Sequence, residues 1–211
     1  MLRSIASFSI IVLLAACSPG SDSDSADAPA DDTSASQTPS PSATDETSVG
    51  EQAPAEKGYA SSYTKLDLDK CRVLDKSTGE GSWIEFRCEG LQDIPLFVSE
   101  GDGRFDVDAG IKNGDFATIG AFNEIGDTIE WRLRDGKPFA VIFRYRDVSM
   151  GSGDRSVLAV ETIGRDGVPG CRVAQIDGSS SNANRRAREI ADTEAINFDC
   201  GKEPQYIGDA R

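Results

Sequence analysis

From position 59 onward, apolar and polar residues alternate along most of this chain, which leaves few ways to bury its apolar side chains. The pattern is clearest from Thr128 to Arg146, where nearly every second residue is apolar on both sides of Asp135-Gly136. Because successive side chains of a strand point to opposite faces, a period of two indicates half-buried strands. Asp-Gly is a favoured two-residue hairpin turn. The segment 128–146 is therefore predicted to be a β-hairpin.

The same pattern predicts further strands at 63–68, 71–75, 82–88, 94–99, 104–108, 156–163 and 171–176. One segment has helical spacing instead, from Asn182 to Ala195, where the residues on one face are apolar: Ala183, Ala187, Ile190, Ala191 and Ala195. The predicted fold class is α+β, a mostly antiparallel sheet with one C-terminal helix packed on a face.

The N-terminal segment is predicted to be an export signal. Arg3 gives it a positive start, residues 5–16 are mostly apolar, and Leu14-Ala15-Ala16-Cys17 ends it. This end resembles the cleavage site of bacterial lipoproteins, which implies removal of residues 1–16 and lipid on Cys17. Several acyl chains would hold the protein at a membrane. An ordinary signal peptide and an uncleaved anchor are the alternatives, and a mostly apolar stretch of twelve residues is short for a membrane span of about twenty. By analogy with enterobacterial sorting, Ser18 favours the outer membrane, facing the periplasm.

Residues 18–57 differ in composition from the rest of the chain. They hold nine acidic residues, one base and no aromatic residue, and they are predicted to form a disordered tether. Residues 58–211 hold 27 acidic and 20 basic residues and are predicted to form one globular domain. This acidic balance argues against nucleic acid as a partner, because phosphate backbones are bound by basic surfaces.

Four cysteines remain if Cys17 carries lipid, and they can pair in three ways. The pairs Cys71–Cys88 and Cys171–Cys200 are favoured, because Cys-Arg-Val opens both segments and Phe-x-Cys closes both. Disulfides are expected outside the cytoplasm. A structural zinc site is disfavoured, because the chain has neither closely spaced cysteines nor any histidine, and no cofactor or metal is predicted.

Residues for catalysis are scarce. The chain lacks histidine, the commonest general base, so triads that depend on imidazole are excluded. Ser152 lies in Gly-Ser-Gly-Asp, which is more typical of a turn than of a nucleophile elbow. Acidic residues are plentiful, so a pair of carboxylates remains the one catalytic arrangement that composition permits. The chain is therefore predicted not to be an enzyme.

The acidic run from Glu100 to Asp108 could supply oxygen ligands to calcium, but its spacing is not that of an EF-hand. Asp106 and Asp108 flank Val107, so their side chains should share one face of a short strand. We expect this face to be solvated.

Arginines of the predicted hairpin form a possible anion site. Arg132, Arg134, Arg144 and Arg146 all fall on the face opposite its large apolar residues. Guanidinium groups bind phosphate and carboxylate through two hydrogen bonds, so this ribbon could meet an anionic glycan, lipid or protein of the cell envelope. It could also be a solvated face that Glu130 and Glu161 neutralise.

Residues 59–208 resemble small cysteine-containing envelope proteins of alphaproteobacteria, through the segments 63–68 (YTKLDL), 130–133 (EWRL) and the terminal Asp199-Cys200. The resemblance supplies no catalytic or binding residue. We expect a membrane-anchored, non-catalytic binding module of the envelope with an unknown partner. A carboxylate-dependent hydrolase of envelope glycans and a structural protein that maintains envelope integrity are the alternatives.

Overall fold

The structure is a computed structural model, and it describes residues 58–211. The predicted signal, the lipidated Cys17 and the tether lie outside these residues. No helix within the described part is long and apolar enough to cross a membrane.

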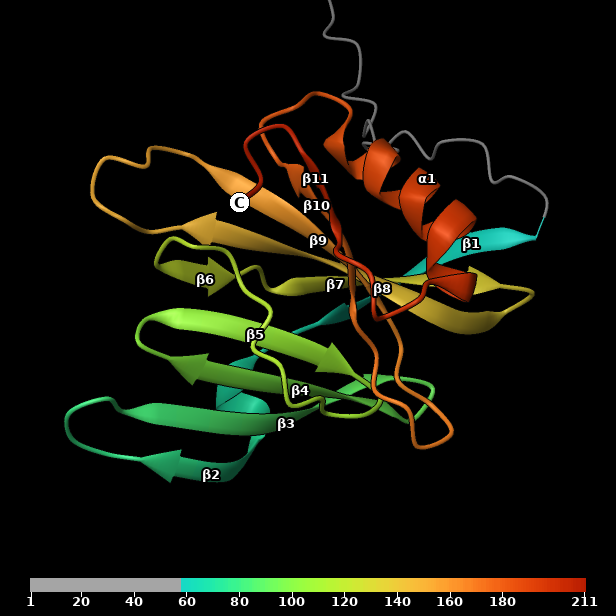
Figure 1. Ribbon diagram of the computed structural model, residues 1–211. Coiled ribbons are helices and arrows are strands. Elements are labelled where there is room, and N and C mark those ends of the chain that lie inside the picture. Colours follow the sequence, from blue (N-terminus) through green and yellow to red (C-terminus); the bar gives the residue numbers. More distant parts are fainter. Residues whose placement is uncertain (1–57) are drawn as a thin grey trace, which may run out of the picture. The chain divides into compact units, whose positions relative to one another are not determined.

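The described residues form three layers, an α-helix on a seven-stranded sheet that packs on a four-stranded sheet (Figure 1). The larger sheet has the order β1-β7-β8-β9-β10-β11, with β6 also paired to β8. Its strands are β1 Tyr59–Lys65, β6 Asn123–Ile125, β7 Thr128–Arg134, β8 Lys137–Asp147, β9 Ser156–Thr162, β10 Arg172–Asp177 and β11 Gln205–Ile207. The smaller sheet is β2 Arg72–Ser77, β3 Trp83–Leu91, β4 Ile94–Gly101 and β5 Arg104–Ala109. All pairings are antiparallel except that of β10 with β11.

These elements confirm the predicted α+β class. The helix α1, Ala183–Glu194, begins and ends within one residue of the predicted segment, and short 3-10 turns cover Leu68–Lys70 and Ala195–Asn197. The predicted strands are all present, although β1 starts and ends a few residues earlier than predicted. Two strands of three residues, β6 and β11, had no alternation long enough to reveal them.

Apolar residues form two separate cores, one on each face of the larger sheet. Between the sheets, Trp131, Val141, Phe143 and Tyr145 pack against side chains of the smaller sheet such as Val98. Below α1, the second core contains Ala140, Ile142, Leu158, Val160, Ala187 and Ile190. The strands β7 to β10 are thus buried on both faces, which explains why few of their residues are exposed.

The hairpin of β7 and β8 forms as predicted, and one irregularity changes its pattern. The pairing shifts between Arg132 and Leu133, so Phe139 packs with the core below α1 rather than with Val141. Trp131 is fully buried and donates from Nε1 to Thr64 Oγ1 over 2.8 Å. A Cβ atom at Gly90 would lie 2.8 Å from the Trp131 ring, so β3 can approach this side chain only with glycine at that position.

Both predicted disulfides are present. Cys71 is bonded to Cys88 with a Cα–Cα distance of 4.5 Å, and Cys171 to Cys200 with 5.7 Å. The first joins the segment before β2 to β3 within the smaller sheet. The second joins the chain that follows α1 to the start of β10, so it fastens the C-terminal segment to the larger sheet.

Removing the second disulfide is expected to lower the stability of the domain. Replacing Cys171 and Cys200 by alanine frees a loop of 29 residues in the unfolded chain, which costs about 3 to 4 kcal/mol of unfolding free energy in the chain-entropy model. Urea denaturation followed by tryptophan fluorescence measures this loss. The matched change at Cys71 and Cys88, which frees 17 residues, should cost about 3 kcal/mol. An unchanged midpoint for either double variant would contradict a structural role.

Candidate functional site

The candidate site is built on β5, where side chains alternate between two environments. Phe105, Val107 and Ala109 point into the core between the sheets. Asp106 and Asp108 share the opposite face, as predicted, but they are only 3% and 5% exposed. The expectation of a solvated face was therefore wrong. The chain from 111 to 118 covers this face of β5, and the backbone N–H of Asn113 donates to Asp108 Oδ2 over 3.2 Å.

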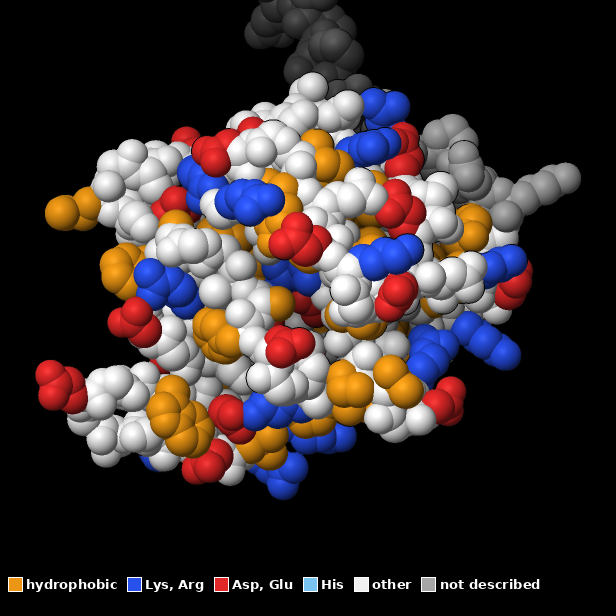
Figure 2. Space-filling view, in the orientation of Figure 1, with side chains coloured by type: hydrophobic (Ala, Val, Ile, Leu, Met, Phe, Trp, Pro, Cys, Tyr) orange, Lys and Arg blue, Asp and Glu red, His pale blue; other side chains and the backbone are white. Residues whose placement is uncertain are grey.

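Beside this segment lies a pocket of about 540 Å³. Trp83, Glu85 and Ser99 of β3 and β4 line it, and so does Phe116 of the segment that covers β5. Trp83 and Phe116 are 37% and 47% exposed, although both are large and apolar. Figure 2 shows acidic and apolar side chains next to each other over the smaller sheet. The pocket thus combines carboxylates with aromatic surface.

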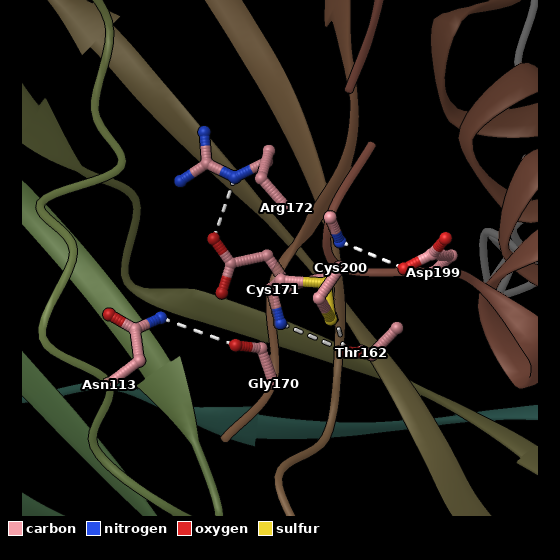
Figure 3. The surroundings of a disulfide bond; sticks show 9 residues. Asn113, Thr162, Gly170, Cys171, Arg172, Asp199 and Cys200 are labelled. Carbon is pink, nitrogen blue, oxygen red and sulfur yellow. Dashed lines mark hydrogen bonds and ion pairs between the residues drawn. A yellow bond between two sulfur atoms is a disulfide. The ribbon is translucent and has the colours of Figure 1, made fainter. Parts of the chain in front are cut away.

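The segment 111–118 is fastened at several points. Lys112 forms an ion pair with Glu85 of β3, and Asn113 Nδ2 donates to the carbonyl oxygen of Gly170 over 3.3 Å (Figure 3). Gly170 directly precedes Cys171, whose disulfide appears in the same view. The Tyr145 hydroxyl donates to the carbonyl of Ala117 over 3.0 Å. These bonds attach the pocket wall to both sheets.

The two aspartates have unusual acidity for carboxylates. Burial raises the pKa of Asp106 to about 6, against the attraction of Arg172. Burial raises the pKa of Asp108 to about 7, and the negative charge of Asp106 adds to this shift. Asp106 Oδ1 is buried without a hydrogen-bond partner among the described residues, 3.9 Å from Arg172 Nη2. Carboxyl groups with pKa values near neutrality inside a pocket are typical of functional sites.

Arg172 lies behind the pocket in a buried polar cluster. Its guanidinium donates to Glu161 Oε1 over 2.6 Å, to Gln175 Oε1 over 2.5 Å and to the Tyr145 hydroxyl over 3.0 Å. Burial raises the pKa of Glu161, and the charge of Arg172 opposes that shift. Three buried carboxylates, those of Asp106, Asp108 and Glu161, thus lie near one guanidinium. Because buried charges of one sign repel strongly, we infer that the cluster retains a proton near neutral pH.

The predicted arginine ribbon is not present as one surface. Arg132 is buried under α1 and forms two hydrogen bonds, of 2.9 and 2.5 Å, with the Asp192 carboxylate of that helix. Arg134 is exposed near the hairpin turn, 5.8 Å from the ring of Tyr59. The helix α1 covers the middle of this face. The alternation within the hairpin does not predict this cover, because the helix is distant in sequence.

Arg144 and Arg146 do lie together, in a second pocket of about 310 Å³ that Arg188 of α1 also lines. Of the two glutamates expected to neutralise the ribbon, Glu130 does pair with one of its arginines, with Oε1 4.0 Å from Arg132 Nη1, and it also accepts from Arg188 over 2.6 Å. Glu161 instead accepts from Arg172 on the opposite face of the sheet. Ser152 lies in the turn between β8 and β9, as predicted.

Sequence reasoning identified Asp106 and Asp108 as neighbours but missed their burial. A usable signal was the segment 110–122, which has no alternation and follows the strand directly. A connection longer than about 12 residues without secondary structure commonly covers a functional site. Arg172 gave no such signal, because its partners come from four separate segments of the chain.

The donor set of the first pocket does not favour a metal. Within residues 58–211, no three acidic, histidine or cysteine side chains are arranged to hold an ion. Comparisons with protein families, with curated proteins and with solved structures found no match to this chain. The function must therefore be inferred from the pockets themselves.

Replacing Asp108 by asparagine tests the raised pKa. A carboxyl whose folded pKa is above its unfolded value of 3.8 binds more protons when folded, so its contribution to stability is lost as pH rises from about 4 to about 7. Asp108→Asn removes this loss, and the new amide oxygen can still accept from the backbone N–H of Asn113. We expect the variant to be more stable than the parent at pH 8, by at most about 4 kcal/mol, and similar in stability near pH 4.

Urea unfolding at several pH values measures this difference in stability. The control is Asp154→Asn, at an exposed turn position, and equal pH profiles for all three proteins would refute the burial effect.

Replacing Arg172 by glutamine tests the buried cluster. The change leaves Glu161 and Asp106 buried without their cation, so we expect a loss of about 3 to 5 kcal/mol in unfolding free energy. Adding Glu161→Gln removes one of these charges and should restore part of the loss. Thermal unfolding of the single and double variants provides the comparison. A double variant that is less stable than Arg172→Gln alone would show that the two residues are not coupled in this way.

Proposed function

We propose that this chain is a lipid-anchored protein of the bacterial cell envelope whose folded domain binds a positively charged, partly apolar ligand. The observation that carries the binding proposal is the 540 Å³ pocket, where Asp106 and Asp108 lie beside exposed aromatic rings. A ligand pocket commonly combines apolar walls with a few polar groups that fix orientation.

The charges that line the pocket favour a cation. Six carboxylates, of Glu85, Glu100, Asp102, Asp106, Asp108 and Asp115, face two basic side chains. Both basic groups are already paired, Lys112 with Glu85 and Arg104 with Asp102 over 2.6 Å. An incoming ammonium or guanidinium would stabilise the ionised forms of Asp106 and Asp108, which burial disfavours. Charge-assisted hydrogen bonds of this kind are stronger than neutral ones.

The aromatic residues add a second requirement for the ligand. Trp83 and Phe116 both line the pocket, and both offer exposed apolar surface. Aromatic faces attract cations as well as apolar groups. An amine or guanidine attached to a hydrocarbon or aromatic group would therefore satisfy both parts of the site, as a basic side chain of a protein or a cationic amphiphile does.

Hydrolysis by a carboxylate pair is the second candidate. The raised pKa of Asp108, about 7, would suit a general acid at neutral pH. Asp106 and Asp108, however, are two residues apart on the same face of one strand, so they lie side by side rather than on opposite sides of a scissile bond. Glycan hydrolysis that depends on Asp108 and falls above pH 7 would establish the enzyme instead.

The proposed location in the cell envelope rests on the sequence. Leu14-Ala15-Ala16-Cys17 fits the lipoprotein signal, and Ser18 fits sorting to the outer membrane. The acyl chains would attach the protein to the membrane, and the Ser-, Asp- and Pro-rich residues 18–57 would link that anchor to the domain. A surface protein, glycan or lipid of the envelope would then be within reach of both pockets.

A matched pair of fluorescent probes tests the charge preference of the pocket. Dansylcadaverine carries an amine, and N-dansyl-6-aminohexanoic acid carries a carboxylate, on the same fluorophore and the same five-carbon chain. We expect the full chain, purified in neutral detergent, to bind dansylcadaverine more tightly, because only the amine pairs with the aspartates. Asp108→Asn should weaken this binding about tenfold, since a charge-assisted bond contributes about 1.5 to 3 kcal/mol.

Two further variants make the probe experiment specific. Trp83→Ala should also weaken dansylcadaverine binding, because it removes an apolar wall, while Asp154→Asn should leave it unchanged. Equal affinity for both probes, or insensitivity to both pocket variants, would rule out this pocket as a cation site. Fluorescence titration measures the affinity of each probe for the parent protein and for each variant.

Replacing Cys17 by serine tests the anchor in bacteria. The thioether that carries the lipid needs the sulfur, so Cys17→Ser should prevent lipid attachment and make precursor processing insensitive to globomycin. The parent protein is expected in the membrane fraction with lipid on Cys17, detected by mass spectrometry. Its processing should stop with globomycin. A parent protein that is processed normally in globomycin and has an unmodified Cys17 would disprove the lipoprotein assignment.

A further inference from the structure

We propose that the second pocket, where Arg144 and Arg146 of β8 meet the first turn of α1, is a binding site for a phosphate group. This site is separate from the acidic pocket and has the opposite charge preference. The phosphate could belong to a lipid headgroup or to a soluble phosphate ester, because both present the same group to the protein.

Arg144 is the residue on which this proposal depends. Six arginines in the described part of the chain are at least partly buried, and Arg144 is one of them. Each of the other five has a carboxylate within 4.0 Å: Arg104, Arg132, Arg155, Arg172 and Arg188. Arg144 has no such partner among the described residues. A partly buried guanidinium without a counter-ion is costly, and an anion bound from outside would remove that cost.

The Arg144 side chain is held in place before any ligand binds. Its Nη1 donates to Ser156 Oγ over 2.7 Å, and its Nη2 donates to Asn184 Oδ1 over 3.3 Å. A Cβ atom at Gly178 would overlap the Arg144 guanidinium, so only glycine permits this placement. A guanidinium has five N–H donors, and these two bonds leave donors available. Such a fixed group binds an anion without a large loss of side-chain entropy.

Arg146 provides a second positive charge on the same wall. It is two residues from Arg144 along β8, it lines the same pocket, and it forms no ion pair with a described residue. Burial and the charge of Arg146 both lower the pKa of Arg144, which indicates that the two cations repel each other. A phosphate dianion between them would relieve that repulsion and accept hydrogen bonds from both.

The other charged groups of the pocket are already paired. Arg188 binds Glu130, and Asp127 accepts from Lys65 over 2.6 Å. Lys65 lies outside the pocket lining, so the lining itself holds three arginines, Arg144, Arg146 and Arg188, against two carboxylates, and its net charge is positive. The first turn of α1 contains no acidic residue, and the partial positive charge at the start of a helix also favours an anion. The 310 Å³ volume is large enough for a phosphate with a small substituent.

Titration calorimetry with inorganic phosphate and glycerol 3-phosphate tests the site in the full chain in neutral detergent. We expect saturable binding that Arg144→Gln weakens at least tenfold. Arg146→Gln changes an exposed side chain, so it should keep the fold and still weaken binding several-fold. The matched control is Arg134→Gln, which removes an exposed arginine of the same hairpin outside the pocket and should change nothing.

Mixed micelles distinguish the sources of the phosphate. A lipid headgroup is supported if the protein binds phosphatidic acid more tightly than glycerol 3-phosphate and does not bind phosphatidylcholine. A soluble phosphate ester is supported if phosphatidic acid and glycerol 3-phosphate bind equally. Asp108→Asn should leave phosphate binding unchanged, so this result is independent of the cation pocket. Absence of phosphate binding, or equal weakening by Arg134→Gln and Arg146→Gln, would overturn the proposal.

Discussion

The buried Arg172 guanidinium connects more parts of this domain than any other interaction described above. It binds Glu161 and Gln175 of the larger sheet. It also binds the Ala117 carbonyl of the segment that covers β5, and it faces Asp106 of the smaller sheet. Gln175 in turn donates to the carbonyl of Ala210, next to the last residue of the chain. A buried charge is tolerated only when its partners surround it. The positions of both sheets, the 111–118 segment and the C-terminus therefore depend on one another.

The same interaction explains why the acidic pocket should attract cations. One guanidinium cannot balance the carboxylates of Asp106, Asp108 and Glu161, and burial prevents water from doing so. Asp106 and Asp108 line the acidic pocket, so part of the excess negative charge lies at its wall. The second pocket has the reverse imbalance, because Arg144 is partly buried without a carboxylate among the described residues. Each pocket thus lacks a charge that a ligand of the opposite sign could supply.

Prediction from sequence was accurate where the signal was local. The hairpin and α1 follow from periods of two and about 3.6 residues, and both were found to within a residue or two. The disulfides were predicted from the repeated Cys-Arg-Val segments, because each segment begins a loop that a disulfide closes. Strands of three residues, β6 and β11, are too short for a period to be measured. Their existence depends on neighbouring strands that offer hydrogen bonds.

The sequence by itself determined the α+β class and the alternating faces of the strands, because these depend on residues close together in the chain, and it favoured the observed one of three cysteine pairings. Only the tertiary structure decided which polar residues are buried. Arg132 was expected on an open face and lies under a helix 60 residues away, and Asp106 lies beneath a segment whose position Arg172 fixes. Burial and charge pairing arise from contacts between distant segments, and a residue's own neighbours in sequence carry little information about them.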